Sequence, residues 1–204
     1  MTRRADSLTP EYFAGLYGGG PDPDPWGFTT SAYEAAKYAA TLAALPRTRY
    51  ASGLEIGCSI GVLTRDLGPR CDALIGIDVV ETALVAARAR CADRPWVRFE
   101  ACAIPEAWPD GRFDLILLSE VVYFFTRDDV ARIGARIGAA IEPGGDVVLV
   151  HWLGETDYPL SGDAAAETFI AAAAGFATPL HGARNADYRI DVLRAHGGTA
   201  VAGA

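Results

Sequence analysis

Short apolar runs alternate with helical stretches along most of the chain, and this alternation constrains the fold more than any other feature. The predicted strands cover residues 54–58, 73–77, 97–102, 113–118, 146–151 and 188–193. The predicted helices cover residues 31–45, 81–90, 128–141 and 164–174, with a short helix ending at Leu67. Such alternation is typical of right-handed crossovers in a parallel sheet, so we expect an α/β fold.

Local signals mark where individual elements begin and end. Ser31 is followed three residues later by Glu34, which is the capping-box pattern, and Pro46 ends that predicted helix. Two segments look irregular: residues 18–27 are rich in glycine and proline, and residues 197–204 are rich in glycine and alanine. We therefore divide the chain into an N-terminal lid or helical extension (1–46), a main domain (47–196) and a flexible tail.

Charge and composition exclude several classes of partner. The chain has 204 residues, half of them apolar, and a formal net charge of −8. An acidic surface repels phosphate backbones, so we do not expect nucleic acid as a partner. It favours a cationic or neutral substrate, although solubility alone also explains it. The four cysteines form no C-x-x-C pair and the three histidines are scattered, so no metal site is expected.

Targeting signals are also missing from the sequence as it stands. The N-terminal residues are polar with no apolar stretch behind them, and no apolar run reaches membrane-spanning length. We therefore expect a cytoplasmic protein without a membrane partner, present as a monomer or weak dimer.

The turn after the first predicted strand carries the strongest ligand signal. It reads Leu54-Glu55-Ile56-Gly57-Cys58-Ser59-Ile60-Gly61, and its small residues let the backbone approach a ligand closely. Glu55 is an acid inside an apolar strand, which is costly without a partner. Asp78 follows the second strand about twenty residues after the turn, the offset at which a carboxylate accepts hydrogen bonds from ribose hydroxyls.

These residues distinguish between two nucleoside cofactors. A nicotinamide enzyme would share Asp78 but would prefer G-x-G-x-x-G, with pyrophosphate at the helix N-terminus. A carboxylate beside the turn suits the sulfonium and amino groups of S-adenosylmethionine and suits a pyrophosphate badly. S-adenosylmethionine is therefore the expected cofactor, and dinucleotide binding is the alternative.

Over residues 50–195 the chain resembles the class I S-adenosylmethionine-dependent methyltransferases. Residues 55–61 look like their first motif, Phe113-Asp114-Leu115-Ile116 with Ser119-Glu120-Val121 like their fourth-strand motif, and Pro143-Gly144-Gly145 like the turn before their fifth strand. Two departures are Ser59, in place of a glycine, and the lack of an acid in residues 102–104. The resemblance implies a Rossmann-like fold with a seven-stranded, mostly parallel sheet and helices on both faces.

The cofactor-binding residues follow from this resemblance and from the strand ends. They are Glu55, Gly57, Cys58, Ser59, Gly61, Asp78, Val79, Cys102, Ala103, Ile104, Ser119, Trp26 and Tyr33. Because residues 102–104 lack an acid, their backbone groups are expected to contact the adenine amino group.

A narrower resemblance, to the NodS-like nodulation methyltransferases, covers nearly the whole chain. The matching residues are 24–28, Tyr33-Glu34, Lys37-Tyr38, 54–64, His151-Trp152, Tyr158-Pro159-Leu160 and 188–193. This resemblance implies N-methylation of the free amine on a terminal, deacetylated glucosamine of a chitooligosaccharide. The alternatives are methylation of another small amine or a hydroxyl, or a cofactor-binding module without catalysis.

Three residues at neighbouring strand ends are candidates for catalysis: Glu120, Tyr123 and His151. We expect them to line one pocket. His151 is either the base that removes a proton from the amine or a hydrogen-bonded structural histidine. Glu120 either binds the acceptor ammonium or caps the next helix, and Tyr123 is either catalytic or a wall aromatic.

Further aromatic and acidic residues have a possible functional role beside an ordinary one. Trp26, Phe28, Tyr33 and Tyr38 are expected to close over the cofactor as a lid, the alternative being a helix packed on the sheet. Trp26 and Trp152 are candidate sugar-stacking surfaces, although tryptophan is more often buried. Asp157 and Asp163 could bind sugar hydroxyls, although turn or helix-capping roles are commoner for aspartate.

Overall fold

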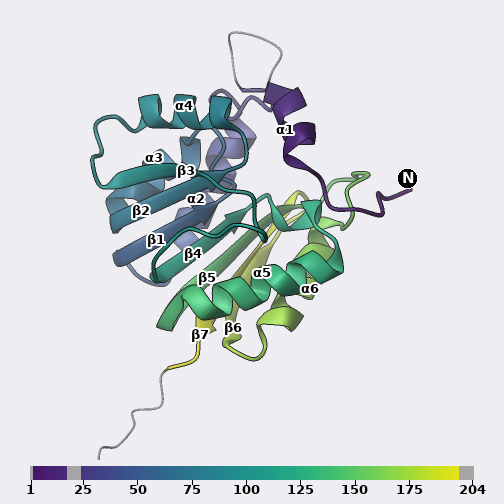
Figure 1. Cartoon of the computed structure of the whole chain (residues 1–204). Helices are drawn as coiled ribbons and strands as arrows, with labels where there is room; N and C mark the ends of the chain where they lie inside the picture. The colour runs from purple at the N-terminus through teal and green to yellow at the C-terminus, as the bar shows by residue number, and fades with distance from the viewer. Residues whose placement is uncertain (1, 18–23, 198–204) are drawn as a thin grey trace, which may run out of the picture.

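The fold is a single twisted sheet covered by helices, seen in a computed structural model that describes residues 2–17 and 24–197 (Figure 1). The strands are β1 (Tyr50–Ile56), β2 (Cys71–Asp78), β3 (Val97–Ala101), β4 (Phe113–Ser119), β5 (Ile141–Trp152), β6 (Ala177–Arg184) and β7 (Tyr188–Ala195). The helices are α1 (Pro10–Tyr17), α2 (Ala32–Ala44), α3 (Val62–Leu67), α4 (Glu81–Arg90), α5 (Arg127–Ala140) and α6 (Gly162–Ala173), with short 3₁₀ turns η1 (Gly68–Arg70) and η2 (Val122–Phe124).

The sheet has seven strands in the order β3-β2-β1-β4-β5-β7-β6. The pairs β1–β2, β1–β4, β2–β3 and β4–β5 are parallel, whereas β7 is antiparallel to both β5 and β6. The predicted seven-stranded, mostly parallel sheet is therefore confirmed. The strand order reverses between β1 and β4, and ligands on open α/β sheets bind at the carboxyl ends beside such a reversal.

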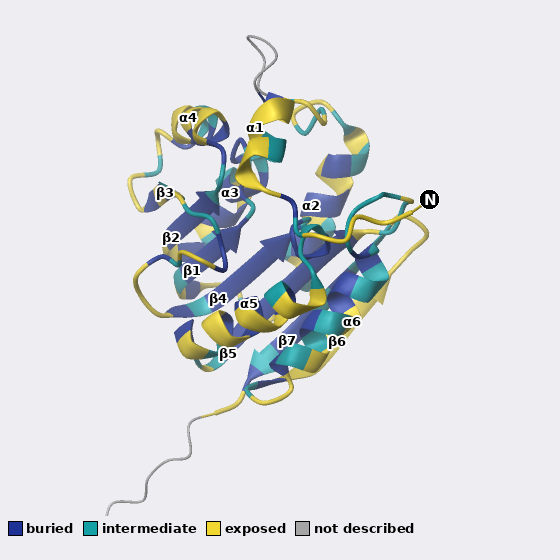
Figure 2. Cartoon of the chain, turned by 45° about the vertical axis from the view of Figure 1, so that its right-hand side comes forward, coloured by how far each residue is buried: buried dark blue, intermediate teal, exposed yellow. Residues whose placement is uncertain are grey.

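Helices cover both faces of the sheet, as predicted. One apolar cluster joins the strands to α5 and α6 through residues such as Val130, Ile133 and Phe169. A second cluster joins the opposite face to α2, α3 and α4 through residues such as Tyr38 and Leu84. Figure 2 shows the central strands buried between these helices, whose outer faces are exposed. Strands buried on both sides read as continuous apolar runs, which is why β4 was readable from sequence.

Most predicted elements match the structure closely. The Ser31 hydroxyl caps α2 by accepting a hydrogen bond from the Glu34 backbone N–H, and α2 ends before Pro46. The reciprocal half of the capping box is replaced, because the Glu34 carboxylate instead binds Lys37. No helix within residues 2–17 and 24–197 is long and apolar enough to cross a membrane.

Three elements differ from the prediction. The residues Pro143-Gly144-Gly145 do not precede β5, because β5 begins at Ile141 directly after α5. Its pairing with β4 jumps from Ile141 to Asp146, so the proline and glycines form an irregular excursion inside the strand. Helix α1 and strand β6 were not predicted. Strand β6 is exposed at every residue except Ala177, so it has no apolar alternation to read.

Some predictions concern segments that the structure describes only in part. The glycine- and proline-rich segment 18–27 lies outside the described residues from 18 to 23. The predicted tail, 197–204, lies outside them from 198 onward. The division of the chain at residue 46 and the predicted oligomeric state remain predictions.

Candidate functional site

A cavity of about 520 Å³ lies at the carboxyl ends of β1, β2 and β4, where the strand order reverses. The predicted site residues in its wall are Trp26, Tyr33, Glu55, Gly57, Cys58, Ser59, Asp78, Val79, Cys102, Ala103, Ile104, Ser119, Glu120 and Tyr123. The predicted residues Gly61 and His151 do not line it. The parallel topology thus brings most of the predicted residues together.

The loop after β1 is built on left-handed backbone conformations. Gly57, Ser59 and Gly61 have φ values of 80°, 50° and 76°. A Cβ atom on Gly57 would lie 3.2 Å from the Ser119 carbonyl oxygen, and one on Gly61 would lie 2.9 Å from Ala87 Cβ. Gly61 is therefore required for the packing of α3 against α4, which explains why it lies outside the cavity wall.

Asp78 fastens this loop to the end of β2. Its Oδ2 atom accepts a hydrogen bond of 2.9 Å from the Ser59 backbone N–H, and its Oδ1 atom accepts one of 3.0 Å from the Val80 N–H. Burial raises the pKa of Asp78, and these backbone donors partly offset that effect. The side chain remains half-buried in the cavity wall, where a ligand hydroxyl can reach it.

Glu55 is a buried acid at the end of β1. It is 1% exposed, and burial raises the pKa of its carboxyl to about 8. A neighbouring hydroxyl, that of Thr64, opposes this shift, but Oε2 has no hydrogen-bond partner among the described residues. A buried carboxylate oxygen without a partner is costly, and a cation in the cavity would supply that partner. This orphaned oxygen fits the positively charged end of S-adenosylmethionine.

Glu120 organises the opposite end of the cavity. Its backbone has a φ of 57°, in the left-handed region. Oε1 accepts a hydrogen bond of 2.5 Å from Lys37 Nζ, while Oε2 accepts from the Tyr123 hydroxyl at 2.7 Å and the Trp152 N–H at 2.8 Å. Both carboxylate oxygens are therefore engaged, and Glu120 joins η2, β5 and α2.

Lys37 is a site residue that sequence reasoning did not single out. Its ammonium donates to Glu34 Oε1 at 3.0 Å as well as to Glu120, and its side chain is 2% exposed. It lies 5.1 Å from the centre of the Tyr33 ring, as a cation–π contact. A Glu–Lys pair three residues apart usually indicates a solvent-exposed helix face. That pattern therefore gives no reason to place Lys37 in a buried site. The neighbouring residues Ala36 and Tyr38 are apolar and aromatic, and they were the sequence signal that this part of the helix is buried.

The prediction that His151 lines the pocket with Glu120 and Tyr123 is wrong. The histidine is fully buried beneath the Tyr123 ring, with the ring centres 5.4 Å apart. Burial lowers the pKa of His151 to about 4, and neither ring nitrogen has a hydrogen-bond partner among residues 2–17 and 24–197. Successive side chains of a β-strand point to opposite faces. Trp152, the next residue of β5, lines the cavity, so the His151 side chain points away from it.

The N-terminal segment forms the outer wall of the cavity. The Tyr17 hydroxyl of α1 lies 2.5 Å from Ser59 Oγ, and the Tyr17 ring contacts the edge of Trp26, which stacks on Phe28. Leu8 N–H donates to the Phe124 carbonyl at 2.8 Å, which ties the start of this wall to η2. The aromatic segment therefore covers the site, and its movement as a lid remains a prediction.

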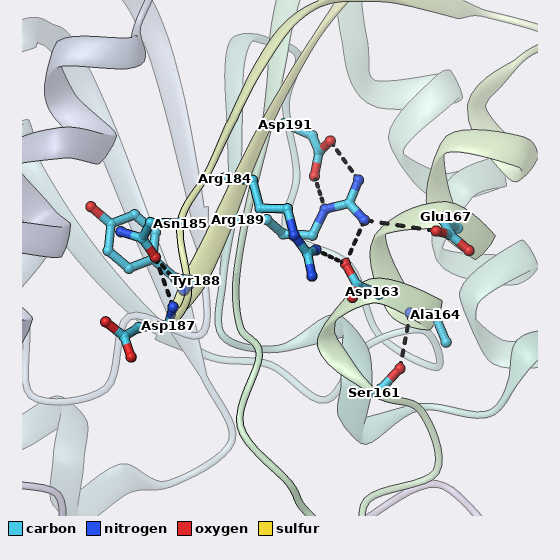
Figure 3. Close-up of polar contacts among 10 residues, drawn as sticks. All are labelled: Ser161, Asp163, Ala164, Glu167, Arg184, Asn185, Asp187, Tyr188, Arg189 and Asp191. Carbon is cyan, nitrogen blue, oxygen red and sulfur yellow. Dashed lines mark hydrogen bonds and ion pairs between the residues drawn. The ribbon is translucent and has the colours of Figure 1, made fainter.

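Two acids predicted as candidates for sugar binding lie away from the cavity. Asp157 forms an ion pair with Arg4 at 3.0 Å. Asp163 pairs with Arg184 and Arg189, beside the cap that Ser161 provides for α6 (Figure 3). Both aspartates therefore form ion pairs, and the expected capping role at α6 belongs to Ser161. Trp152 and Trp26 do line the cavity and are 37% and 40% exposed, so both residues are partly open to a ligand.

Known proteins resemble this chain in sequence. The model of the Nodulation protein S (NodS) family matches residues 21–143. Nodulation protein S of Bradyrhizobium diazoefficiens is 36% identical over 115 residues, which are 56% of this chain and 54% of that protein. The homologue from Rhizobium tropici is 30% identical over 129 residues, 61% of this chain and 53% of the relative. The chain thus spans about half the length of the curated relatives it matches.

Solved structures resemble it over more of their length. A Pseudomonas syringae protein assigned as a methyltransferase is 35% identical and has a TM-score of 0.71, covering 80% of this chain and 99% of that one. The N-methyltransferase NodS from Bradyrhizobium japonicum WM9, in complex with S-adenosylhomocysteine, is 22% identical and has a TM-score of 0.76 over 91% and 97% of the chains. The predicted class I methyltransferase fold is thereby confirmed.

Proposed function

Because this chain belongs to the Nodulation protein S (NodS) family, we propose that it is an S-adenosylmethionine-dependent N-methyltransferase. One observation carries the proposal. A cavity at the sheet's switch point has a buried carboxyl oxygen of Glu55 that no described residue partners, next to the loop that Asp78 holds in place. That combination suits a nucleoside with a cationic end, whereas an acid beside the loop suits a pyrophosphate badly.

The residues at the ends of β1, β2 and β3 would hold the cofactor. Glu55 offers a carboxyl oxygen to its amino group and Asp78 offers oxygens to its ribose hydroxyls. The backbone of residues 102–104 would bind the adenine ring. When bound, S-adenosylmethionine supplies an activated methyl group on a sulfonium. The wall formed by Tyr17, Trp26 and Phe28 would exclude water from that end of the cavity.

The remaining residues would orient the acceptor. Nitrogen must present a lone pair in line with the methyl group, so the main task of the protein is positioning. Glu34, Lys37 and Glu120 carry formal charges that leave one net negative charge at the acceptor end, which favours an amine over a hydroxyl. We propose the free amine of a deacetylated glucosamine in a chitooligosaccharide as the acceptor. The family relationship and the exposed ring of Trp152, which can stack on a sugar, support this choice.

The cofactor assignment is tested by calorimetric titration of the intact protein with S-adenosylhomocysteine. Saturable binding to one site, in the micromolar range, is the expected result. A protein that shows no binding would overturn the proposed function. The same titration with NADH is the matched control, and preferential binding of the dinucleotide would favour the alternative cofactor.

The acceptor assignment needs a separate assay. Release of S-adenosylhomocysteine from S-adenosylmethionine is compared between a deacetylated chitooligosaccharide and a panel of small amines and phenols. Turnover of the sugar above that of the panel is expected. If only the panel reacts, the sugar assignment is wrong, and tight cofactor binding with no turnover of any acceptor would indicate a binding module without catalysis.

A further inference from the structure

Glu34 has an unsatisfied anionic atom at the acceptor end of the cavity. Its Oε1 atom accepts the hydrogen bond from Lys37, but Oε2 is buried and has no hydrogen-bond partner in the part of the chain described. The residue is 9% exposed and lines the cavity. Burial, the Glu34 charge and the closeness of the Glu34 carboxylate to the Tyr38 hydroxyl all raise the pKa of Tyr38, so this phenol stays neutral beside the acid. A ligand atom can therefore satisfy this oxygen.

Glu120, the other acid at this end, has no such capacity. Its two oxygens already accept three hydrogen bonds, from Lys37, Tyr123 and the Trp152 backbone. A ligand cation at Glu120 would share an oxygen that already has a donor, whereas a cation at Glu34 meets an oxygen with no donor among the described residues. The hydrogen bonds thus point to Glu34, which the sequence analysis treated as a capping residue, rather than to the catalytic candidate Glu120.

The charge count points the same way. Two carboxylates, Glu34 and Glu120, share one ammonium, that of Lys37, in a setting where the Lys37 side chain is 2% exposed. Their formal charges sum to minus one. An uncompensated charge in a poorly hydrated site is costly, and one bound cation would neutralise the cluster.

Tyr33 provides a second acceptor one residue away. Its hydroxyl oxygen is also buried without a hydrogen-bond partner among the described residues, and it lines the same cavity. Burial, followed by the charges of Glu120 and Glu34, raises the pKa of Tyr33 above its usual range, so the phenol stays neutral. Its oxygen can accept a hydrogen bond from an ammonium, which has three N–H groups to donate.

From these contacts we infer that Glu34 binds the ammonium form of the acceptor and takes up one of its protons before methyl transfer, which frees the nitrogen lone pair, while Tyr33 accepts a second hydrogen bond. This inference rests on the proposed N-methyltransferase function and assigns the substrate class to an amino sugar with a free ammonium. Lys37 is a positioning residue that holds the carboxylates of Glu34 and Glu120 apart. The site would reject an N-acetylated sugar, because an acetamide has no charge to offer Glu34.

The test uses intact protein saturated with S-adenosylhomocysteine, so that no turnover occurs. Chitotetraose deacetylated at its terminal residue and fully acetylated chitotetraose are titrated separately by calorimetry. The wild type is expected to bind the deacetylated sugar more tightly. Glu34→Gln keeps the shape and removes the charge, and it should weaken that binding about 30-fold while leaving the acetylated sugar unaffected. Glu167→Gln, on the exposed face of α6, is the matched control and should change neither.

Undiminished binding of the deacetylated sugar by Glu34→Gln overturns the inference, as does a wild type that does not distinguish the two sugars. Affinity for S-adenosylhomocysteine is the folding control for each variant. If Glu34→Gln loses that affinity, Tyr33→Phe carries the test, with an expected loss of about 5-fold for the deacetylated sugar only, and no loss overturns the inference. A wild type that fails to bind S-adenosylhomocysteine overturns the proposed function instead, so the two failures are distinguishable.

Discussion

The two ends of the cavity are built in different ways. The cofactor end uses residues that are close in the sequence, Glu55 to Ser59 and Asp78, and much of its structure is backbone geometry. The acceptor end brings together groups that are far apart in the chain: Lys37 of α2, Glu120 directly after β4, and the backbone N–H of Trp152 in β5. A local motif can therefore identify the first end, whereas only the folded topology assembles the second.

This difference has an energetic side. At the cofactor end the acids bind no basic side chain among the described residues: Glu55 has an oxygen without a hydrogen-bond partner, and Asp78 accepts only from backbone N–H groups. At the acceptor end most polar groups are already paired with one another, and Lys37 is the link between them. We therefore expect substitutions at the acceptor end to affect folding most, and those at the cofactor end to affect ligand affinity.

The largest effect is expected from Lys37→Met. Removing this ammonium leaves Glu34 and Glu120 as buried like charges, so the free energy of unfolding should fall by about 4 kcal/mol. Denaturant titration measures it. The control is Arg88→Met, whose ion pair with Glu81 is exposed and should contribute less than about 0.5 kcal/mol. Equal losses of stability in both variants would mean that Lys37 in its cluster stabilises the fold no more than an exposed ion pair does.

Asp78→Ala should act on ligand affinity instead. It removes the acceptor for ribose hydroxyls and the two bonds that hold the Ser59 loop, so affinity for S-adenosylhomocysteine should fall about 100-fold. Asp72→Ala, at the opposite end of β2 in an exposed pair with Arg49, is the matched control and should bind normally. Retained affinity in Asp78→Ala would contradict the assignment of the cofactor end.

The glycine turn gives a smaller, structural contrast. Gly61 and Gly144 both have a φ above 70°, but a Cβ atom at Gly61 meets Ala87, whereas nothing lies within 4 Å at Gly144. Gly144→Ala should cost only the backbone penalty of about 1 kcal/mol, and Gly61→Ala about 3 kcal/mol because overpacking is added. Thermal unfolding compares the two variants. Similar losses of stability would show that α3 and α4 can move apart to admit the added methyl group.

Per pH unit, the smallest effect is the change in stability set by Glu55. Because burial raises its pKa from 4.5 to about 8, the folded state keeps a proton that the unfolded state has lost between these values. Stability should therefore fall by about 1.4 kcal/mol per pH unit as the pH rises through this window. Glu55→Gln should remove that slope.

His151 has the opposite effect below pH 6.5, because its pKa is lowered to about 4. It contributes equally to the wild type and to Glu55→Gln, so the difference in stability between the two proteins isolates Glu55. A difference that does not change with pH would contradict the buried, protonated acid.

The sequence predicted the parts of the fold that depend on local patterns. The apolar runs of β1 to β4 and the caps of α2 were readable because periodicity and capping act over a few residues. Strand β6 was not readable, since it is exposed and carries proline and glycine. The excursion at Pro143 to Gly145 was misplaced because its turn residues lie inside the strand pairing.

The candidate site divides along the same line. Glu55, Asp78 and Glu120 could be placed at strand ends because parallel topology brings those ends together. His151 was misplaced because the face to which a strand residue points depends on register, which its own sequence does not state. Lys37 and Tyr17 were missed because their partners, Glu120 and Ser59, come from distant segments.

Methyl transfer is the most direct test of the central claim that one cavity holds a cofactor end and an amine-binding end. Intact protein is incubated with S-adenosylmethionine and chitotetraose deacetylated at its terminal residue, and the mass of the sugar is measured by mass spectrometry. The account predicts a product heavier by one methylene unit, on the free nitrogen, and no change in the fully acetylated sugar. An unchanged deacetylated sugar, or methylation of the acetylated one, would contradict it.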